Sequence, residues 1–183
     1  MGNFLKIGWM VGVLAGGIVA CAQQSEKNEK AMKALAIGDE IPRFVLKDQH
    51  GKEFDVADYI GEKTLVIYFY PKDESPGCTK QACAFRDSFA DYTDAGAMVI
   101  GINSGSVESH KAFAEKHQLP FTLLSDPGND VLKAFGVKNV LFLTGRETFV
   151  VDLDGRLAFK YRALMNAPRH NDKVLDFLDG HSS

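Results

Sequence analysis

One run of residues restricts the fold of this chain more than any other. Thr64–Tyr70 reads TLVIYFY, a continuous stretch of β-branched and aromatic residues. A strand of this composition is covered on both faces, which is typical of a sheet that lies between two layers of helices. The segment Ala97–Ile102 has the same character and is predicted to be a second buried strand.

The segments around these two runs alternate between helical and extended patterns. Asp154-Gly155 joins the last two predicted strands, and this dipeptide is a strong hairpin signal. The order predicts an α/β chain with a thioredoxin-like fold, in which a mixed central sheet has helices on both faces. Helices are predicted over 78–95, 106–118, 126–136 and 171–178, and further strands over 43–47, 53–56, 121–124, 148–153 and 157–161.

The first twenty residues differ from the rest. Lys6 is their only charge, and residues 7–20 form an apolar, glycine-containing run that is short for a membrane-spanning helix but suits a secretory signal. The run ends at Ile18-Val19-Ala20-Cys21, which resembles a bacterial lipobox. We therefore expect residues 1–20 to be a lipoprotein signal peptide and Cys21 to be the lipidated, membrane-attached first residue. The alternative is an uncleaved anchor helix.

The residue after the cysteine bears on location. Ala22 stands where an aspartate would retain such a lipoprotein at the inner membrane, so we expect a periplasm-facing protein at the outer membrane. Residues 21–33 are polar and lack aromatic side chains, which predicts a flexible tether. Residues 34–180 then form one domain.

Composition excludes two classes of protein. The 183 residues include 21 basic and 24 acidic side chains, for a net charge of −3. Surfaces that bind nucleic acid are basic, so we expect no nucleic-acid partner. Thirteen Phe and five Tyr supply ample surface to bury, which argues against intrinsic disorder.

Residues that could carry chemistry are concentrated between the first long strand and the following helix. The segment 71–83 reads PKDESPGCTKQAC and places Cys78 where that helix begins. Unpaired backbone N–H groups and the helix dipole stabilise a thiolate there. Cys78 lies four residues before Ala82, on the face expected to pack inward, and Ser75 can offer a hydroxyl to the same pocket. Cys78 could instead be a small buried hydrophobic residue.

This segment resembles a known family. Residues 68–78 fit the peroxiredoxin pattern P-x-x-x-[T/S]-x-x-C, and the continuation to Cys83 is similar to the bacterioferritin-comigratory, or peroxiredoxin Q, branch. The likeness runs from about residue 36 to residue 178 and includes the stretches 121–126 and 146–152.

The resemblance implies a role for each matching residue. Cys78 would be the peroxidatic cysteine, Ser75 the pocket hydroxyl, Pro71 the shield of the reacting sulfur, and Arg146 the arginine that stabilises the thiolate and orients the peroxide. Serine at 75 replaces the more frequent threonine, which keeps the hydroxyl and loses a methyl group. Considered alone, Arg146 would be a solvated surface charge and Ser75 a turn residue.

The implied activity is a thiol-dependent reduction of hydrogen peroxide and organic hydroperoxides that needs no metal or organic cofactor. Cys78 would become a sulfenic acid, and Cys83 would condense with it to an intrachain disulfide, as in an atypical 2-Cys peroxiredoxin. Alternatively, Cys83 packs the helix and an external thiol resolves Cys78. The expected partners are a peroxide and an exported thioredoxin-like or other thiol reductant. The resemblance is compatible with a monomer or a weak dimer.

Other thioredoxin-like functions fit the sequence less well. A thiol–disulfide oxidoreductase needs C-x-x-C, usually after Trp, whereas four residues separate Cys78 from Cys83 and the one tryptophan, Trp9, lies in the signal. A copper-carrying lipoprotein needs closely spaced cysteines and a nearby histidine. The histidines show no metal-ligand spacing and are expected at the surface; they are His50, His110, His117, His170 and His181.

Overall fold

The structure is a computed structural model that describes residues 34–138 and 145–180. The predicted signal peptide, Cys21 and the tether lie outside the described residues, so their processing and lipidation stay predictions. Within the described part, no helix combines the length and the apolar character needed to cross a membrane.

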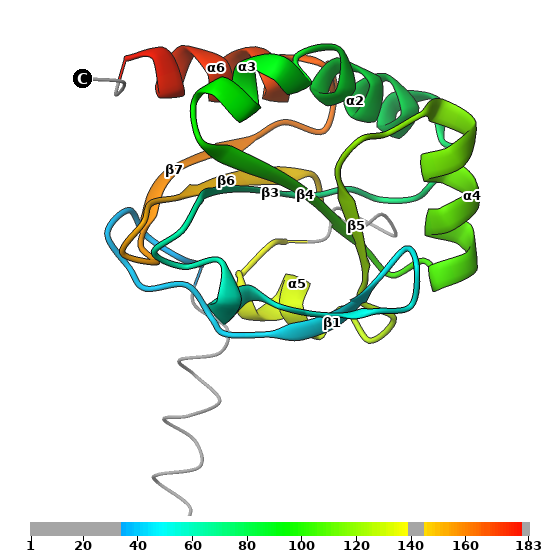
Figure 1. The fold of residues 1–183 in the computed structure, drawn as a ribbon, viewed down its shortest axis with the longest axis horizontal. Helices are drawn as coiled ribbons and strands as arrows, with labels where there is room; N and C mark the ends of the chain where they lie inside the picture. The colour runs from blue at the N-terminus through cyan, green and yellow to red at the C-terminus, as the bar shows by residue number, and fades with distance from the viewer. Residues whose placement is uncertain (1–33, 139–144, 181–183) are drawn as a thin grey trace, which may run out of the picture. The chain divides into compact units, whose positions relative to one another are not determined.

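A seven-stranded mixed sheet forms the centre of the described residues, in the order β2-β1-β5-β4-β3-β6-β7 (Figure 1). Strands β3, β4 and β5 are mutually parallel, and the other neighbouring pairs are antiparallel. The carboxyl ends of the three parallel strands therefore share one edge of the sheet. The strands are β1 (Val45–Asp48), β2 (Glu53–Asp55), β3 (Thr64–Phe69), β4 (Ala97–Asn103), β5 (Thr122–Ser125), β6 (Glu147–Val151) and β7 (Leu157–Arg162).

Helices cover both faces of this sheet. Alternate residues of β3 contribute to different cores: Leu65, Ile67 and Phe69 pack with α5, while Val66 and Tyr68 pack with α2, α3, α4 and α6. The continuous apolar run thus forms a strand that is buried on both faces, and the predicted thioredoxin-like α/β class is confirmed. The helices are α2 (Pro76–Asp87), α3 (Phe89–Asp94), α4 (Val107–His117), α5 (Asp130–Ala134) and α6 (Arg169–Asp179), with a short 3-10 turn, η1 (Val56–Asp58).

Gly101 on β4 makes room for the ring of Tyr68. The two residues are direct neighbours across the parallel β3–β4 pair, and a Cβ at position 101 would lie 2.7 Å from the tyrosine ring. That ring stacks on Phe85 of α2, with 4.8 Å between ring centroids. The glycine therefore permits the packing of α2 on the sheet.

The predicted helix over 78–95 is two helices. It begins earlier, at Pro76, because Ser75 caps the first turn and proline is tolerated at the first helical position. It stops at Asp87, and α3 begins after Ser88, whose hydroxyl accepts a hydrogen bond of 3.1 Å from Asn171 Nδ2 of α6. The local sequence pattern does not indicate this contact with a distant helix, so the break at Ser88 was not predicted.

The predicted helix over 126–136 is also shorter. The Asp126 carboxylate accepts hydrogen bonds from the backbone N–H groups of Asp130 and Leu132, at 2.9 and 3.0 Å, so Pro127 lies in a turn before α5. The hairpin between β6 and β7 is confirmed, with Gly155 at a φ of 74° in its turn.

Candidate active site

Cys78 lies in the first turn of α2, directly beyond the carboxyl end of β3. Its side chain is 1% exposed and faces inward with Ala82, as the four-residue spacing predicted. The Ser75 hydroxyl accepts a hydrogen bond from the Cys78 backbone N–H at 3.4 Å and donates one to the Lys72 carbonyl at 3.2 Å. Ser75 is therefore the N-cap of the helix that carries Cys78.

Arg146 reaches the same thiol from the neighbouring strand of the sheet. It directly precedes β6, whose first residue, Glu147, is opposite Phe69 at the carboxyl end of β3. The Arg146 side chain is 5% exposed, and its Nη2 donates a hydrogen bond to Cys78 Sγ at 3.2 Å. The interpretation of Arg146 as a solvated surface charge is wrong, because the pairing of β3 with β6 buries it at this end of the sheet.

Gln81 completes the contacts of the guanidinium. It lies one turn after Cys78 on α2, is fully buried, and its Oε1 accepts a hydrogen bond from Arg146 Nη1. Two further buried donors of these side chains, Gln81 Nε2 and Arg146 Nε, have no hydrogen-bond partner among the described residues. The pocket therefore combines a buried thiol, a positive charge and unpaired hydrogen-bond donors.

The electrostatics of this pocket favour a negative charge on sulfur. A guanidinium in hydrogen-bond contact and the N-terminal end of a helix both stabilise an anion. Tyr68, beneath α2, contributes no competing charge, since burial and the neighbouring Cys78 raise the pKa of its hydroxyl well above the ordinary value.

The other predicted site residues lie on the same segment. Cys83 is half-buried on α2, and both it and Cys78 are free thiols within one uninterrupted helix. Pro71 is half-buried in the loop between β3 and α2. Cys21 lies outside the described residues. In the part of the chain that the structure describes, no group of three or more His, Cys, Asp or Glu side chains could hold a metal ion.

The expectation that the histidines lie at the surface is wrong for His110 and His170, which are both completely buried. His170 lies between Thr148 Oγ1 and the Ala163 carbonyl, at 2.8 and 2.9 Å. His110 belongs to a polar network around Asp73 that the sequence pattern does not indicate. His110 lies three residues before Phe113, on the inward face of α4, and this helical spacing was the available signal that His110 is buried.

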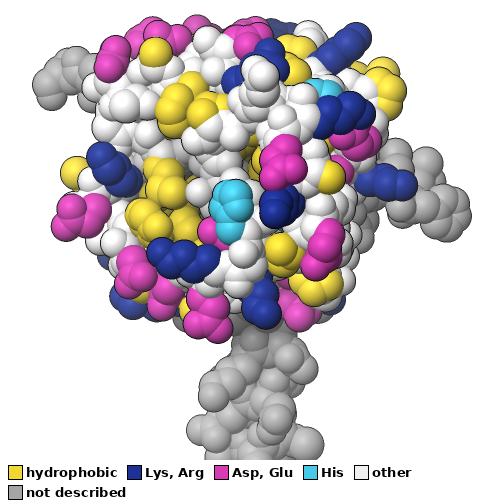
Figure 2. Space-filling model, turned by 45° about the vertical axis from the view of Figure 1, so that its right-hand side comes forward, with side chains coloured by type: hydrophobic (Ala, Val, Ile, Leu, Met, Phe, Trp, Pro, Cys, Tyr) yellow, Lys and Arg dark blue, Asp and Glu magenta, His cyan; other side chains and the backbone are white. Residues whose placement is uncertain are grey.

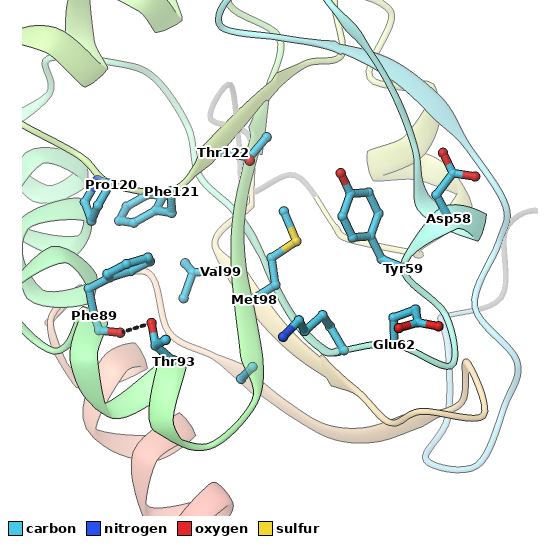
Figure 3. A pocket seen from close by; sticks show the side chains of 12 residues that line it. Asp58, Tyr59, Glu62, Phe89, Thr93, Met98, Val99, Pro120, Phe121 and Thr122 are labelled. Atoms are coloured by element: carbon cyan, nitrogen blue, oxygen red, sulfur yellow. Dashed lines mark hydrogen bonds between the residues drawn. The ribbon is translucent and has the colours of Figure 1, made fainter.

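A separate pocket of about 470 Å³ lies far from this chemistry (Figure 3). Met98, Val99 and Thr122 line it at the amino ends of β4 and β5, together with Phe89 and Phe121, whereas Cys78 follows the carboxyl end of β3. Ligands of open α/β sheets bind at the carboxyl ends of strands, so the pocket is not assigned to the thiol site. The face in Figure 2 shows interspersed charges of both signs and small, separate apolar patches.

Comparison with protein families and curated proteins gives a consistent match. Residues 37–160 match the model of the AhpC/TSA family. The curated protein "Peroxiredoxin Q, chloroplastic" from Sedum lineare is 52% identical over 143 residues, which cover 77% of this chain and 76% of the relative. The proteins of the same name from Gentiana triflora and Arabidopsis thaliana are covered to 65% and 66% of their lengths.

Solved structures of related proteins match the chain as well. Peroxidoxin BcpB from Mycobacterium tuberculosis superposes with a TM-score of 0.76 at 33% identity, over 81% of this chain and 99% of that one. The bacterioferritin comigratory protein of Xanthomonas campestris, studied for its alkyl peroxide reduction activity, superposes with a TM-score of 0.72 at 30% identity, over 79% and 100% of the two chains.

The comparison corrects the expected location. The matched relatives from Sedum lineare, Gentiana triflora and Arabidopsis thaliana are all named as chloroplast proteins. They point to a plastid and contradict the prediction of a periplasm-facing protein at a bacterial outer membrane. The run before Cys21, on which that prediction depended, lies outside the region shared with the family model.

Proposed function

Because the chain belongs to the AhpC/TSA family and is a peroxiredoxin of the Q type, a thiol-dependent peroxidase, we propose that Cys78 is its peroxidatic cysteine. The observation that carries this assignment is the 3.2 Å hydrogen bond from Arg146 Nη2 to the buried Cys78 Sγ at a helix N-terminus. The substrates that we propose are hydrogen peroxide and organic hydroperoxides. The alkyl peroxide reduction named for the Xanthomonas campestris relative supports the second class.

The proposed first step is a nucleophilic substitution at oxygen. The Cys78 thiolate attacks the peroxide oxygen that carries a hydrogen, an S–O bond forms and the O–O bond breaks, which leaves a sulfenic acid that retains this hydrogen. The other oxygen departs with the O–O electron pair and takes up a proton to become water or an alcohol. The sulfur is oxidised by two electrons and the peroxide is reduced by two.

Arg146 has two tasks in this proposal. Its Nη2 stabilises the thiolate in the resting pocket, and its unpaired Nε, with the unpaired Gln81 Nε2, offers hydrogen bonds to the peroxide oxygens as charge develops on them. The Ser75 hydroxyl holds the Cys78 backbone N–H and keeps the thiol in place. Pro71, in the preceding loop, shields the sulfur from solvent.

Cys83 is the proposed resolving cysteine. Its thiol condenses with the Cys78 sulfenic acid, so that an S–S bond forms and water leaves. A thiol reductant, for which a thioredoxin-like protein is the natural candidate, then returns both cysteines to thiols by disulfide exchange. We expect the enzyme to act as a monomer or a weak dimer; both cysteines belong to one helix, so the disulfide needs no partner subunit.

Intact mass tests this proposal directly. The fully reduced domain from residue 34 receives one equivalent of hydrogen peroxide, alongside its Cys78→Ser and Cys83→Ser variants. We expect a rapid loss of about 2 Da in the wild type and a trappable sulfenic acid on Cys78 in Cys83→Ser. Slow oxidation of all three, at the rate of an ordinary free thiol, would contradict the assignment.

A further inference from the structure

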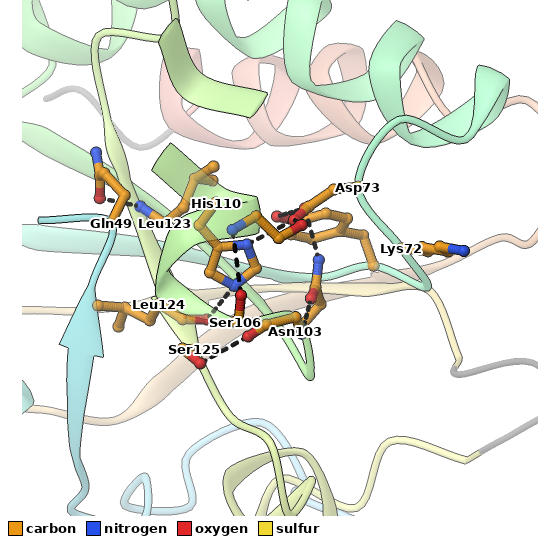
Figure 4. A network of polar contacts seen from close by, with 12 residues as sticks. Gln49, Lys72, Asp73, Asn103, Ser106, His110, Leu123, Leu124 and Ser125 are labelled. Carbon is orange, nitrogen blue, oxygen red and sulfur yellow. Dashed lines mark hydrogen bonds and ion pairs between the residues drawn. The ribbon is translucent and has the colours of Figure 1, made fainter. Parts of the chain in front are cut away.

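The carboxylate of Asp73 is the centre of a buried polar network in the loop between β3 and α2 (Figure 4). Its Oδ1 accepts hydrogen bonds from Tyr70 Oη and Asn103 Nδ2, at 2.8 and 2.9 Å. Its Oδ2 accepts one from Ser109 Oγ at 2.6 Å and lies 2.8 Å from His110 Nδ1. A carboxylate has about four lone-pair sites, so these four contacts occupy all of them.

Asp73 is ionised in this network. Burial opposes its ionisation, but the hydrogen bonds from His110 and Ser109 outweigh burial and lower the pKa of Asp73 to about 2. An ionised carboxylate only accepts hydrogen bonds. His110 Nδ1 must therefore carry a proton.

The other ring nitrogen of His110 also faces an acceptor. Its Nε2 lies 3.2 Å from the backbone carbonyl oxygen of Leu124 on β5. A neutral imidazole has one donor nitrogen and one acceptor nitrogen, so a neutral ring would direct a lone pair at one of these two oxygens. The side chain is completely buried, which denies that lone pair a hydrogen bond from bulk water. Only the doubly protonated ring donates to both oxygens.

We propose that His110 is an imidazolium at neutral pH and that its buried ion pair with Asp73 positions the loop that leads into Cys78. The function of this loop rests on the proposed role of Cys78 as the peroxidatic residue. The protonation state of His110 does not depend on that role.

The other ionisable groups near His110 are neutral, engaged or exposed. Burial raises the pKa of Tyr70 well above its usual value, so its hydroxyl is a neutral donor. Asp126 after β5 and Asp48 on β1 direct their carboxylates at backbone N–H groups. Lys72 points away from the network in Figure 4, and on α4 itself Glu108 and Lys111 are exposed. Asp73 is thus the charge that His110 faces.

The pair connects α4 to the pocket through two neighbouring residues. Glu74, directly after Asp73, has a φ of 59°, a left-handed conformation that residues other than glycine seldom adopt. Its carboxylate pairs with Lys116 of α4 at 2.7 Å. Ser75 follows and caps the Cys78 N–H. The attachment of Asp73 and Glu74 to α4 therefore holds an unfavourable backbone conformation that places the cap of α2.

The protonation state is tested by NMR of the reduced, full chain labelled with ¹⁵N-histidine, with His110→Gln used to assign the signals. We expect two ring N–H protons on His110 at neutral pH in the wild type, and one in Asp73→Asn. A single ring proton in the wild type would overturn the proposal. This readout needs no peroxidase activity, so it separates failure of the ion pair from failure of the proposed function.

Positioning is tested by the rate at which hydrogen peroxide oxidises Cys78. We expect Asp73→Asn and His110→Gln each to lower it by roughly tenfold to 100-fold, the scale of a small misplacement of reacting groups. Because both act through one pair, the double variant should lose little more than either single variant. The exposed His50→Gln is the matched control and should keep the wild-type rate. Additive losses, or unchanged rates in folded variants, would overturn the positioning role.

Discussion

Arg146 Nη2 donates a hydrogen bond to Cys78 Sγ at 3.2 Å, although 68 residues separate the two along the chain. The contact exists because β6 pairs antiparallel with β3 and begins opposite Phe69, where β3 ends. α2 begins beyond the same end of β3, so both side chains arrive at one edge of the sheet. The thiol site is thus a product of sheet topology.

Replacement of this arginine should slow the oxidation of Cys78 strongly. We expect Arg146→Gln to lower the second-order rate constant with hydrogen peroxide by roughly 100-fold, because it removes a positioned charge and donor. Arg146→Lys keeps the charge but loses the forked geometry, so its rate constant should lie between those of the wild type and Arg146→Gln. Stopped-flow kinetics measures the rate, with the exposed Arg43→Gln as the matched control. Equal rates in Arg146→Gln and Arg43→Gln would contradict the role of Arg146 in the oxidation of Cys78.

The parts of this site that depend on local signals could be predicted from the sequence. The apolar spacing from Cys78 to Ala82 indicates an inward-facing thiol at the start of a helix, and the thiol lies as expected, whereas the role of Ser75 as the cap of that helix was not predicted. Arg146 could be assigned only through the family pattern, since no local feature distinguishes a buried arginine from a solvated one. Its burial depends on the strand pairing that forms later in the chain.

The burial of the histidines could not be predicted from hydropathy for a similar reason, although the spacing of His110 from Phe113 indicates the inward face of α4. His110 is buried because Asp73 and Leu124, on two other elements, supply partners for both of its nitrogens. The break of the long helix at Ser88 depends on Asn171 of α6 in the same way. Hydropathy describes a residue alone, whereas partners from distant segments decide whether a polar side chain is buried.

The cap of α2 should contribute to both stability and rate. Ser75→Ala removes the acceptor for the Cys78 N–H, and we expect a loss of about 1 kcal/mol in the free energy of unfolding. It should also slow Cys78 oxidation, while Ser75→Thr should retain both properties. Asp55→Ala removes the cap of η1, where Asp55 Oδ1 accepts from the Ala57 N–H at 2.9 Å. Asp55→Ala should lose stability without slowing the oxidation of Cys78. If Ser75→Ala and Asp55→Ala slowed this oxidation equally, the effect of Ser75 on Cys78 would not come from the cap of α2.

Disulfide formation should unwind the start of α2. Five residues along a helix place the Cα atoms of Cys78 and Cys83 roughly 8–9 Å apart, whereas a disulfide needs them closer than about 7 Å. Both cysteines lie inside the uninterrupted helix of the reduced protein. Hydrogen exchange of the oxidised wild type should therefore show lost protection in the first turns of α2. The Cys83→Ser variant should keep that protection after the same peroxide treatment, and an unchanged pattern in the oxidised wild type would contradict the intrachain disulfide.

His170 should make the stability of the fold depend on pH. Burial, with a further contribution from the charge of Arg146, lowers the pKa of His170 from 6.5 to about 4, despite its contact with the Ala163 carbonyl. The unfolded chain then binds more protons than the folded protein between these two values. The contribution of His170 to the free energy of unfolding is fully present above pH 6.5. It is lost as the pH falls toward about 4, a change of roughly 3 kcal/mol.

Urea unfolding across that pH range measures the effect. The free energy of unfolding of the wild type should fall more steeply with acidification than that of His170→Gln, whose side chain cannot take up the proton. His50→Gln, which replaces an exposed histidine, should keep the wild-type slope. If His170→Gln also kept the wild-type slope, the acid sensitivity would have to arise from another group, and His170 would take up its proton over the same pH range in the folded and unfolded states.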